Sequence, residues 1–371
     1  MSSPAVSRKR TISSFFAPSQ PPKRARLSPP ASAHAFKRER SISPPYSDRQ
    51  TNKAQPDDKT LIAFTESEQP ASVHPHYPHP IRALPPALVQ TLNLAPSAPE
   101  KHLNSNPDLD CLYYTPYVPP SLQNPLFNFL RSELPFYRVK YNIKRGNVET
   151  LINTPRYTTV YGVDETSFFA DPPDGNGGAV KPLLDSGSRK PVPASSYKCK
   201  PRPIPACLDS LRLSAEAATG HTFNFVLVNY YANGTDSISY HSDDERFLGP
   251  DPCIASFSFG AARDFLLRHK NKDLDPKERD VKLKLESGDM ILMRGSTQSK
   301  WLHSLPKRAG KQAGEQGRIN ITLRKAMVKG GTENYYRYNV GEGEVYRWSE
   351  DKKEMVVWTD GGSATTKPTT T

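Results

Sequence analysis

The chain has 371 residues and a formal net charge of +12 at pH 7, from 50 lysines and arginines against 38 aspartates and glutamates. This length allows one large domain with additional segments, and the basic excess favours an anionic partner, nucleic acid first. No apolar run reaches the length of a membrane span and no signal-peptide core is evident, which predicts no membrane partner. The 4 cysteines lack C-x-x-C spacing, so a reducing compartment is expected.

Residues 1–106 are rich in proline, serine and charge and poor in periodic apolar residues, which predicts a disordered basic tail. Its basic clusters, residues 8–10 and 23–26, resemble a bipartite nuclear localisation signal. We therefore expect a nuclear import receptor as a partner and the nucleus as the location. A solvated basic tail is the alternative.

A short apolar group lies between these clusters. One helical turn brings Ile12 near Phe15 and Phe16, and this group resembles the peptide that binds the PCNA sliding clamp. Lys9 stands where that pattern has glutamine, so a chance apolar cluster is the alternative.

The folded domain is expected over residues 107–330, and a C-terminal extension with a disordered end over 331–371. A short strand is predicted at 112–114, followed by a helix with Ser121 as its N-cap. Alternating apolar residues over 137–152 predict a hairpin that turns at 145–147. Residues 171–200 form a Gly/Pro-rich loop, and an apolar stripe from Ile204 to Leu211 predicts a helix ended by Gly220.

Short strands dominate the rest of the chain. They are predicted at 223–231, 254–259, 264–268, 281–285, 290–293 and 318–325, and 334–358 is expected to form an additional packed segment. Many short strands after leading helices predict a mostly β fold with flanking helices, of the α+β class, built as a sandwich or jelly roll.

A His-x-Asp pair points to a metal site. In an extended chain residues i and i+2 point to the same side, so His241 and Asp243 aim at one point. His303 completes the set if its strand lies beside theirs. Two imidazoles and one carboxylate form the facial triad that suits non-haem Fe(II) and leaves coordination positions open.

A later strand carries arginines on one face. The same periodicity places Arg318, Asn320, Thr322 and Arg324 together. Buried cations need an anionic partner, and the guanidinium fork binds a carboxylate through two hydrogen bonds. An acid with two carboxylates, one held by arginine and one chelating iron, satisfies both groups. The sequence leaves open which arginine holds which carboxylate.

Each pattern alone has a simpler interpretation. A His-x-Asp pair is commonly a surface pair, a single histidine is commonly a core residue, and an arginine-bearing strand can be a polar barrel face or a nucleic-acid surface. Their joint occurrence in this order favours the iron site.

These segments resemble the AlkB family of Fe(II)- and 2-oxoglutarate-dependent dioxygenases. Residues 229–243 match its Asn-x-Tyr-x-x-Gly-x-Asp-x-Ile-x-x-His-x-Asp run, and residues 318–324 match its Arg-x-Asn-x-Thr-x-Arg motif. Residues 254–265 and 301–306 resemble the eukaryotic homologues that repair alkylated DNA. The resemblance covers roughly residues 109–325.

The resemblance implies a double-stranded β-helix, or jelly roll, with a nucleotide-recognition lid. Fe(II) would bind His241, Asp243 and His303, and O2 would be the co-substrate. The 2-oxoglutarate carboxylates would be held by Arg318 and Arg324, together with Asn229, Tyr231 and Asn320. The implied function is oxidative demethylation of 1-methyladenine and 3-methylcytosine in DNA, a direct-reversal repair that releases formaldehyde and succinate.

The resemblance also implies substrate contacts. Tyr161 would line the base pocket, Arg156 would support the lid or a phosphate, and Glu245 would face the base. The DNA backbone would be contacted by Arg263, Arg268, Lys270, Lys307, Arg308 and Lys311, for which a solvated basic face is the alternative.

The sequence does not fix the substrate, and three functional classes are compared. The hydrophobic finger of duplex-repair homologues has no obvious single match near 141–152, so single-stranded DNA, duplex DNA and RNA all remain. An RNA demethylase, or a protein or small-molecule hydroxylase of the same superfamily, is the alternative function. An inactive binding barrel is disfavoured, because it has no physical need for the full triad and both arginines.

Overall fold

The computed structural model describes residues 81–145, 148–171, 181–197, 199–308, 317–329, 340 and 343–358. All of the described residues belong to one compact unit within residues 68–371. The predicted localisation signal, the clamp peptide with Ile12, Phe15 and Phe16, and Lys311 of the basic loop lie outside the described residues.

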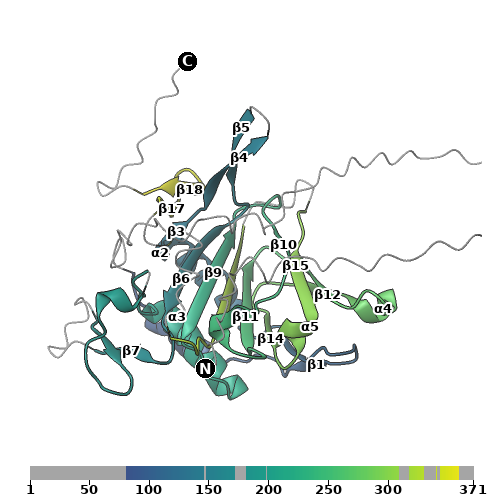
Figure 1. Cartoon of the computed structure of the whole chain (residues 1–371), viewed down its shortest axis with the longest axis horizontal. Coiled ribbons are helices and arrows are strands. Elements are labelled where there is room, and N and C mark those ends of the chain that lie inside the picture. The colour runs from purple at the N-terminus through teal and green to yellow at the C-terminus, as the bar shows by residue number, and fades with distance from the viewer. Residues whose placement is uncertain are drawn as a thin grey trace, which may run out of the picture. The chain divides into compact units, whose positions relative to one another are not determined.

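A 10-stranded antiparallel sheet forms the larger layer of this unit (Figure 1). Its central strands alternate between residues facing the second sheet and residues facing the helices. In spatial order the strands are β1 (Lys101–Leu103), β2 (Cys111–Tyr114), β14 (Met290–Met293), β11 (Ile254–Gly260), β16 (Arg318–Arg324), β9 (Phe225–Tyr231), β6 (Tyr157–Gly162), β3 (Phe136–Tyr137), β17 (Val345–Ser349) and β18 (Glu354–Val357).

A 4-stranded antiparallel sheet faces it, in the order β10 (Ile238–His241), β15 (Trp301–Leu305), β12 (Arg263–His269) and β13 (Asp280–Leu285). The space between the sheets is filled by a buried cluster that includes Phe225, Leu227, Phe265, Leu267 and Trp301. Two facing antiparallel sheets with few helices confirm the predicted mostly β class and agree with a jelly roll.

Helices cover the outer face of the larger sheet. They are α1 (Pro86–Leu92), α2 (Pro120–Glu133) and α3 (Ala206–Thr219). Leu126 and Leu130 of α2 and Leu208 and Leu211 of α3 are fully buried in one cluster with the outward residues of the sheet. Gly220 ends α3 at φ 71°, as predicted, because glycine adopts the left-handed conformation without steric cost.

The smaller elements connect these layers. The hairpin β4 (Lys140–Arg145) and β5 (Val148–Asn153) is confirmed and projects from the body (Figure 1). A second hairpin pairs β7 (Ser167–Phe169), which precedes the segment 171–200 expected to be a loop, with β8 (Leu183–Asp185), which lies inside it. The remaining short helices are η3 (Ala194–Ser196), η4 (Arg246–Leu248), α4 (Pro276–Arg279) and α5 (Thr297–Lys300).

Described elements lie outside the expected domain boundaries at both ends. Residues 81–106, expected in the tail, form α1 and β1, and Leu84 and Leu92 are 5% and 1% exposed because they pack against the helical face. At the other end, the strand pair β17–β18 continues the larger sheet beside β3, within the segment 334–358 that was expected to pack as an addition. The N-cap of α2 is Pro119, with proline at the first helical position, instead of Ser121.

The C-terminal strands are packed against α2 through one arginine. The Arg131 guanidinium lies between the Trp348 ring, 3.8 Å from its centroid, and the Phe127 ring, 4.8 Å from its centroid. Tyr346 packs against Tyr157, with ring centroids 5.1 Å apart. Within the described part of the chain, no helix has the length and apolar character to cross a membrane.

Candidate metal and dicarboxylate site

The predicted metal ligands converge because their strands are neighbours. β10 pairs with β15, and the register places His241 opposite His303, with ring centroids 4.2 Å apart. Asp243 lies just beyond β10, with its carboxylate oxygens 3.9 Å from His241 Nε2 and 3.8 Å from His303 Nε2. One ligand atom from each residue lies within 4.8 Å of the others, a spacing that fits a single metal ion.

Both imidazoles are held in positions that suit metal ligands. His241 Nδ1 lies 2.8 Å from the Ser239 carbonyl, which leaves Nε2 free to coordinate. Burial lowers the pKa of His303 well below its usual range, and the nearby His241 and Arg324 lower it further. A neutral ring keeps its lone pair available to a metal.

Arg324 orients the acidic side of the site. Its Nη2 donates to Asp243 Oδ1 at 2.6 Å, and its Nη1 lies 3.3 Å from Glu245 Oε1. All three side chains are largely buried, at 2%, 5% and 17% exposure. Arg324 therefore already has acidic partners within the protein and fixes the carboxylate that faces the metal.

Arg318 is different, because it is a buried cation that has no acid beside it among the described residues. Its residue is 3% exposed, and its Nη2 donates to Ser258 Oγ at 2.8 Å. Within the part of the chain that the structure describes, its Nε has no hydrogen-bond partner. Burial lowers its pKa to about 10. A carboxylate supplied by a bound ligand would satisfy both the charge and the free N–H.

The other predicted cosubstrate residues lie on the adjacent strand or the same one. β16 pairs with β9 so that Arg318 faces Tyr231 and Asn320 faces Asn229. Asn320 Nδ2 donates to Ser256 Oγ and the Phe257 carbonyl at 2.9 and 2.8 Å. The structure thus brings together all five predicted residues, and they fit a dicarboxylate whose one end reaches the metal.

Tyr161 was placed wrongly in the base pocket. Along β6, Thr158 and Val160 face the interior, since Thr158 bonds Asn229 at 2.8 Å. Tyr161 therefore points to the opposite face and is fully buried against the helices. Arg156 is 4% exposed, which excludes it as a surface phosphate contact and leaves support of the segment as its predicted role.

Arg263 was also misassigned to the DNA backbone. It is 3% exposed, and its Nη2 donates to the carbonyls of Asp236 and Pro306 at 2.8 and 2.6 Å. Residues 263, 265 and 267 of β12 point to the interior, so this buried arginine links the two loops that contain Asp236 and Pro306.

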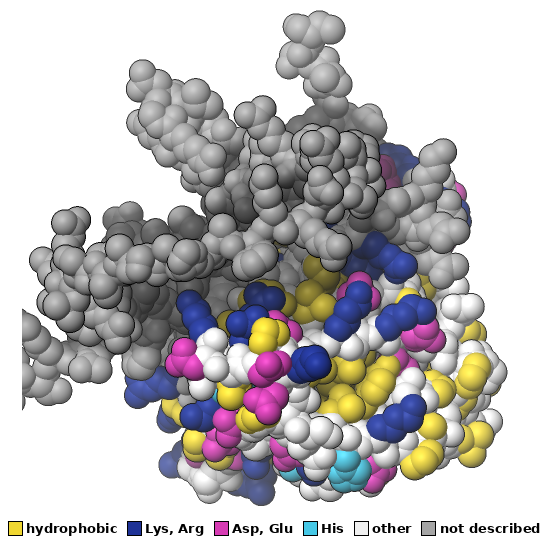
Figure 2. Space-filling model, turned by 90° about the vertical axis from the view of Figure 1, so that its right-hand side faces the viewer, with side chains coloured by type: hydrophobic (Ala, Val, Ile, Leu, Met, Phe, Trp, Pro, Cys, Tyr) yellow, Lys and Arg dark blue, Asp and Glu magenta, His cyan; other side chains and the backbone are white. Residues whose placement is uncertain are grey.

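The other basic residues are exposed and partly paired. Arg268 pairs with Asp280 at 2.7 Å, and Lys270 lies 3.4 Å from Asp244. Lys307 and Arg308 are exposed at the start of the loop after β15. Basic and acidic side chains are interspersed on the face turned to the viewer in Figure 2. That face therefore has no continuous basic field over the described residues.

Sequence reasoning missed the serines of β11. Ser256 and Ser258 are 4% and 2% exposed and bond Asn320 and Arg318. The available signal was two polar residues at i and i+2 within an otherwise apolar strand, which indicates a polar face toward the interior.

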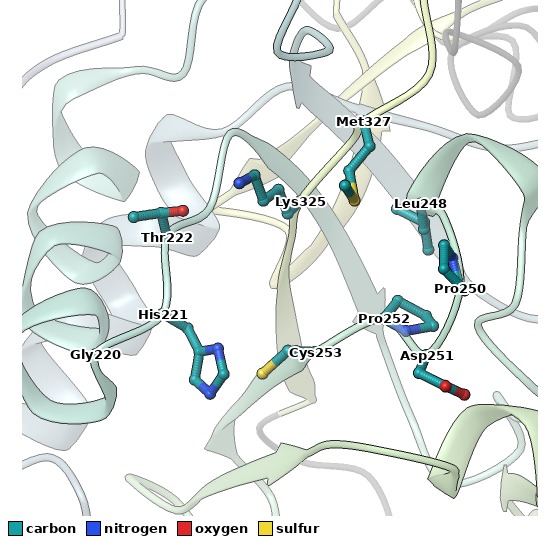
Figure 3. A pocket seen from close by; sticks show the side chains of 10 residues that line it. All are labelled: Gly220, His221, Thr222, Leu248, Pro250, Asp251, Pro252, Cys253, Lys325 and Met327. Carbon is teal, nitrogen blue, oxygen red and sulfur yellow. The ribbon is translucent and has the colours of Figure 1, made fainter.

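A separate pocket of about 240 Å³ lies at the C-terminal end of α3 (Figure 3). Its lining includes His221, Cys253, Lys325 and Met327, and none of the metal ligands. It is therefore distinct from the site described above.

Two antiparallel sheets with a His-Asp-His set between them, beside a buried arginine, define the class: a jelly-roll oxygenase built for a non-haem metal and a dicarboxylate. A family profile described as the 2OG-Fe(II) oxygenase superfamily matches residues 110–324, and the chain belongs to this superfamily. Membership implies Fe(II) and 2-oxoglutarate as cofactors, which the residues present fit.

The similar curated proteins confirm the AlkB resemblance. The chain is 42% identical over 137 residues to DNA oxidative demethylase ALKBH2 of Homo sapiens, covering 36% of this chain and 51% of that one. It is 44% identical over 122 residues to alpha-ketoglutarate-dependent dioxygenase alkB homolog 3 of Homo sapiens, covering 32% and 41%. The Arabidopsis thaliana ALKBH2 is 37% identical over 143 residues, covering 34% and 44%.

The matched region thus spans about half the length of these relatives. Among solved structures, that of OsALKBH1 aligns with a TM-score of 0.35 at 15% identity, over 61% of this chain and 100% of that one.

Proposed function

We propose that this protein is a DNA oxidative demethylase that removes methyl groups from N-alkylated bases such as 1-methyladenine and 3-methylcytosine, releasing formaldehyde and succinate. The observation that carries the proposal is the His241, Asp243 and His303 set beside Arg318, a buried cation with no acidic partner among the described residues. The substrate class is supported by the ALKBH2 and alkB homolog 3 relatives.

In this proposal the metal ligands are His241, Asp243 and His303, and bound Fe(II) supplies the oxygen-activating chemistry of the superfamily. Arg318 holds the distal carboxylate of 2-oxoglutarate, because it lacks an acid partner among the described residues. Arg324 orients Asp243 and lies near the other end of the cosubstrate. Asn229, Tyr231 and Asn320 complete the polar lining between the two arginines.

A base in duplex DNA must leave the stack to reach this site. Glu245 lies beside the metal carboxylate and is 17% exposed at its side chain, so it can meet the polar edge of an inserted base. The projecting β4–β5 hairpin lies directly before residues 155–162, the segment that resembles the family's recognition lid (Figure 1). Leu151 on β5 is 58% exposed, which supports an apolar contact with neighbouring bases.

The remaining parts of the proposal concern backbone contacts and location. Arg268, Lys270, Lys307 and Arg308 are the exposed candidates for phosphate contacts, and Lys311 belongs to the same loop. The basic clusters at 8–10 and 23–26 support nuclear import. Ile12, Phe15 and Phe16 are the proposed clamp-binding residues.

The deciding experiment measures formaldehyde release and methyl loss from a 3-methylcytosine oligonucleotide, single-stranded and duplex, with and without Fe(II) and 2-oxoglutarate. Repair that needs both cofactors supports the proposal, and the strand preference identifies the preferred form of DNA. Succinate production stimulated by methylated RNA, a protein or a metabolite, without DNA repair, would retain the oxygenase chemistry and replace the substrate. The Asp243→Ala variant is the inactive control.

A further inference from the structure

The backbone of Asp243 needs a partner that its own strand does not supply. β10 ends at His241, so Asp243 lies beyond the paired part of the strand. The residue is 4% exposed, and a buried backbone N–H without an acceptor is costly. Gln298 supplies the acceptor: its Oε1 lies 2.9 Å from the Asp243 nitrogen.

The orientation of the Gln298 amide is fixed from both sides. The side chain is part of a residue that is 1% exposed, and its Nε2 lies 3.3 Å from Met293 Sδ, a weak acceptor. The Asp243 N–H can only donate, so the atom facing it must be the amide oxygen. Lys270 Nζ donates to the Gln298 carbonyl at 3.0 Å, which holds the backbone of the glutamine as well.

Gln298 lies on α5, the short helix that leads into the strand carrying His303. α5 is fastened through Thr297, whose hydroxyl accepts from the Asp110 nitrogen at 3.0 Å and lies 3.1 Å from the Asp110 carbonyl. The chain leaves α5 directly into β15, which carries His303. Gln298 thus joins the loop that bears one ligand to the segment that sets the position of another.

We propose that Gln298 is a positioning residue for the metal centre. Arg324 holds the Asp243 carboxylate, and Gln298 holds its backbone, so the direction of the carboxylate is fixed at both ends. Outer contacts of this kind tune the affinity of metal sites. The inference rests on the metal-ligand part of the proposed function and is independent of the substrate.

The test is Gln298→Met, which keeps the length of the side chain and removes the acceptor. Titration of the metal-free protein with Co(II) should show a dissociation constant raised about tenfold or more. Hydrogen exchange in the metal-free protein should be faster for the peptide containing Asp243 and unchanged for the one containing Leu267. If Gln298 has only a structural role, the substitution would lower the melting temperature and change neither the Co(II) dissociation constant nor the hydrogen exchange of these peptides.

The matched control is Gln123→Met, because Gln123 is a half-buried glutamine of α2 that donates to the Val118 carbonyl at 3.1 Å. It should leave Co(II) affinity unchanged. An affinity of Gln298→Met within about threefold of the unmodified protein would overturn the proposal.

A second variant decides the matter if Gln298→Met does not fold. Gln298→Glu retains an oxygen toward the Asp243 N–H, so its Co(II) affinity should be at least that of the unmodified protein. A tenfold loss in this variant would overturn the proposal, since a retained acceptor should retain the geometry. Because neither reading needs turnover, a protein that binds Co(II) but repairs no DNA would refute only the proposed substrate.

Discussion

Replacing Arg318 with methionine should separate cosubstrate binding from stability, because the two effects have opposite signs. In the protein alone, Arg318 is a buried cation whose described partners include Ser258 but no acid. Burial lowers its pKa from 12.5 to about 10, which corresponds to a cost of about 3 kcal/mol for keeping it charged at neutral pH. The lost hydrogen bond to Ser258 is worth about 1 kcal/mol.

The two magnitudes predict that Arg318→Met leaves the free energy of unfolding of the cosubstrate-free protein unchanged or raises it by up to about 2 kcal/mol. In the proposed complex with 2-oxoglutarate, the same arginine pairs with a carboxylate. Loss of one partner of such a buried pair costs about 3 kcal/mol, or roughly 150-fold in Kd.

The assay is denaturant unfolding of the variant without cosubstrate, combined with thermal shifts of the Mn(II)-loaded protein at increasing 2-oxoglutarate. The Arg318→Lys variant should bind 2-oxoglutarate with an affinity between those of the unmodified protein and Arg318→Met, since lysine keeps the charge but cannot form the paired guanidinium hydrogen bonds. Arg202→Met is the control: Arg202 is 1% exposed and bonds the Tyr137 hydroxyl at 3.0 Å, so its loss should lower stability and leave cosubstrate affinity alone. If the Arg318→Met variant is less stable than the unmodified protein but binds 2-oxoglutarate normally, the assignment of Arg318 to a cosubstrate carboxylate is refuted.

Three further outcomes are expected. Gly162→Ala should destabilise the fold by about 3 kcal/mol or more, because φ is +103° and a Cβ would lie 2.1 Å from the Asn224 carbonyl oxygen. At Gly187 a Cβ would meet only Asp185 Oδ1, at an ordinary contact distance of 3.6 Å, so Gly187→Ala should be near neutral in the same denaturant titration. Burial raises the pKa of the Cys207 thiol to about 12, so iodoacetamide should modify it in the native protein at pH 8 roughly a thousandfold more slowly than a free thiol. The rate should rise about tenfold per pH unit. Modification at the rate of a free thiol, measured by mass spectrometry, would contradict this burial. Lys307→Gln should reduce the salt dependence of DNA binding by about one unit in log K against log salt, and an unchanged slope would remove Lys307 from the phosphate contacts.

The metal and cosubstrate residues could be found from the sequence because their geometry is local. His241 and Asp243 are two residues apart, and Arg318 and Arg324 share one face of a single strand. The period of an extended chain is enough to bring such pairs together. The only long-range step was His303, which needed β15 beside β10.

Two of the predicted nucleic-acid residues were misplaced for a related reason. Periodicity states which residues share a face, but not which face meets the site. Tyr161 and Arg263 were taken from the motif without that information, and the structure turns Tyr161 to the helices and Arg263 into the interior. Gln298 could not be predicted at all, since its partner Asp243 is 55 positions away and nothing local marks the contact.

The strand pair β17–β18 determines how short a recombinant fragment of this protein can be. The family match ends at residue 324, yet β17 pairs with β3 through Val345 and Tyr346. A fragment cut after the match would leave an unpaired sheet edge, and such edges promote self-association. It would also uncover Arg131, which stacks on Trp348. Fragments for crystallisation or assay should therefore extend at least through residue 358, and shorter ones should aggregate even though every metal ligand is present.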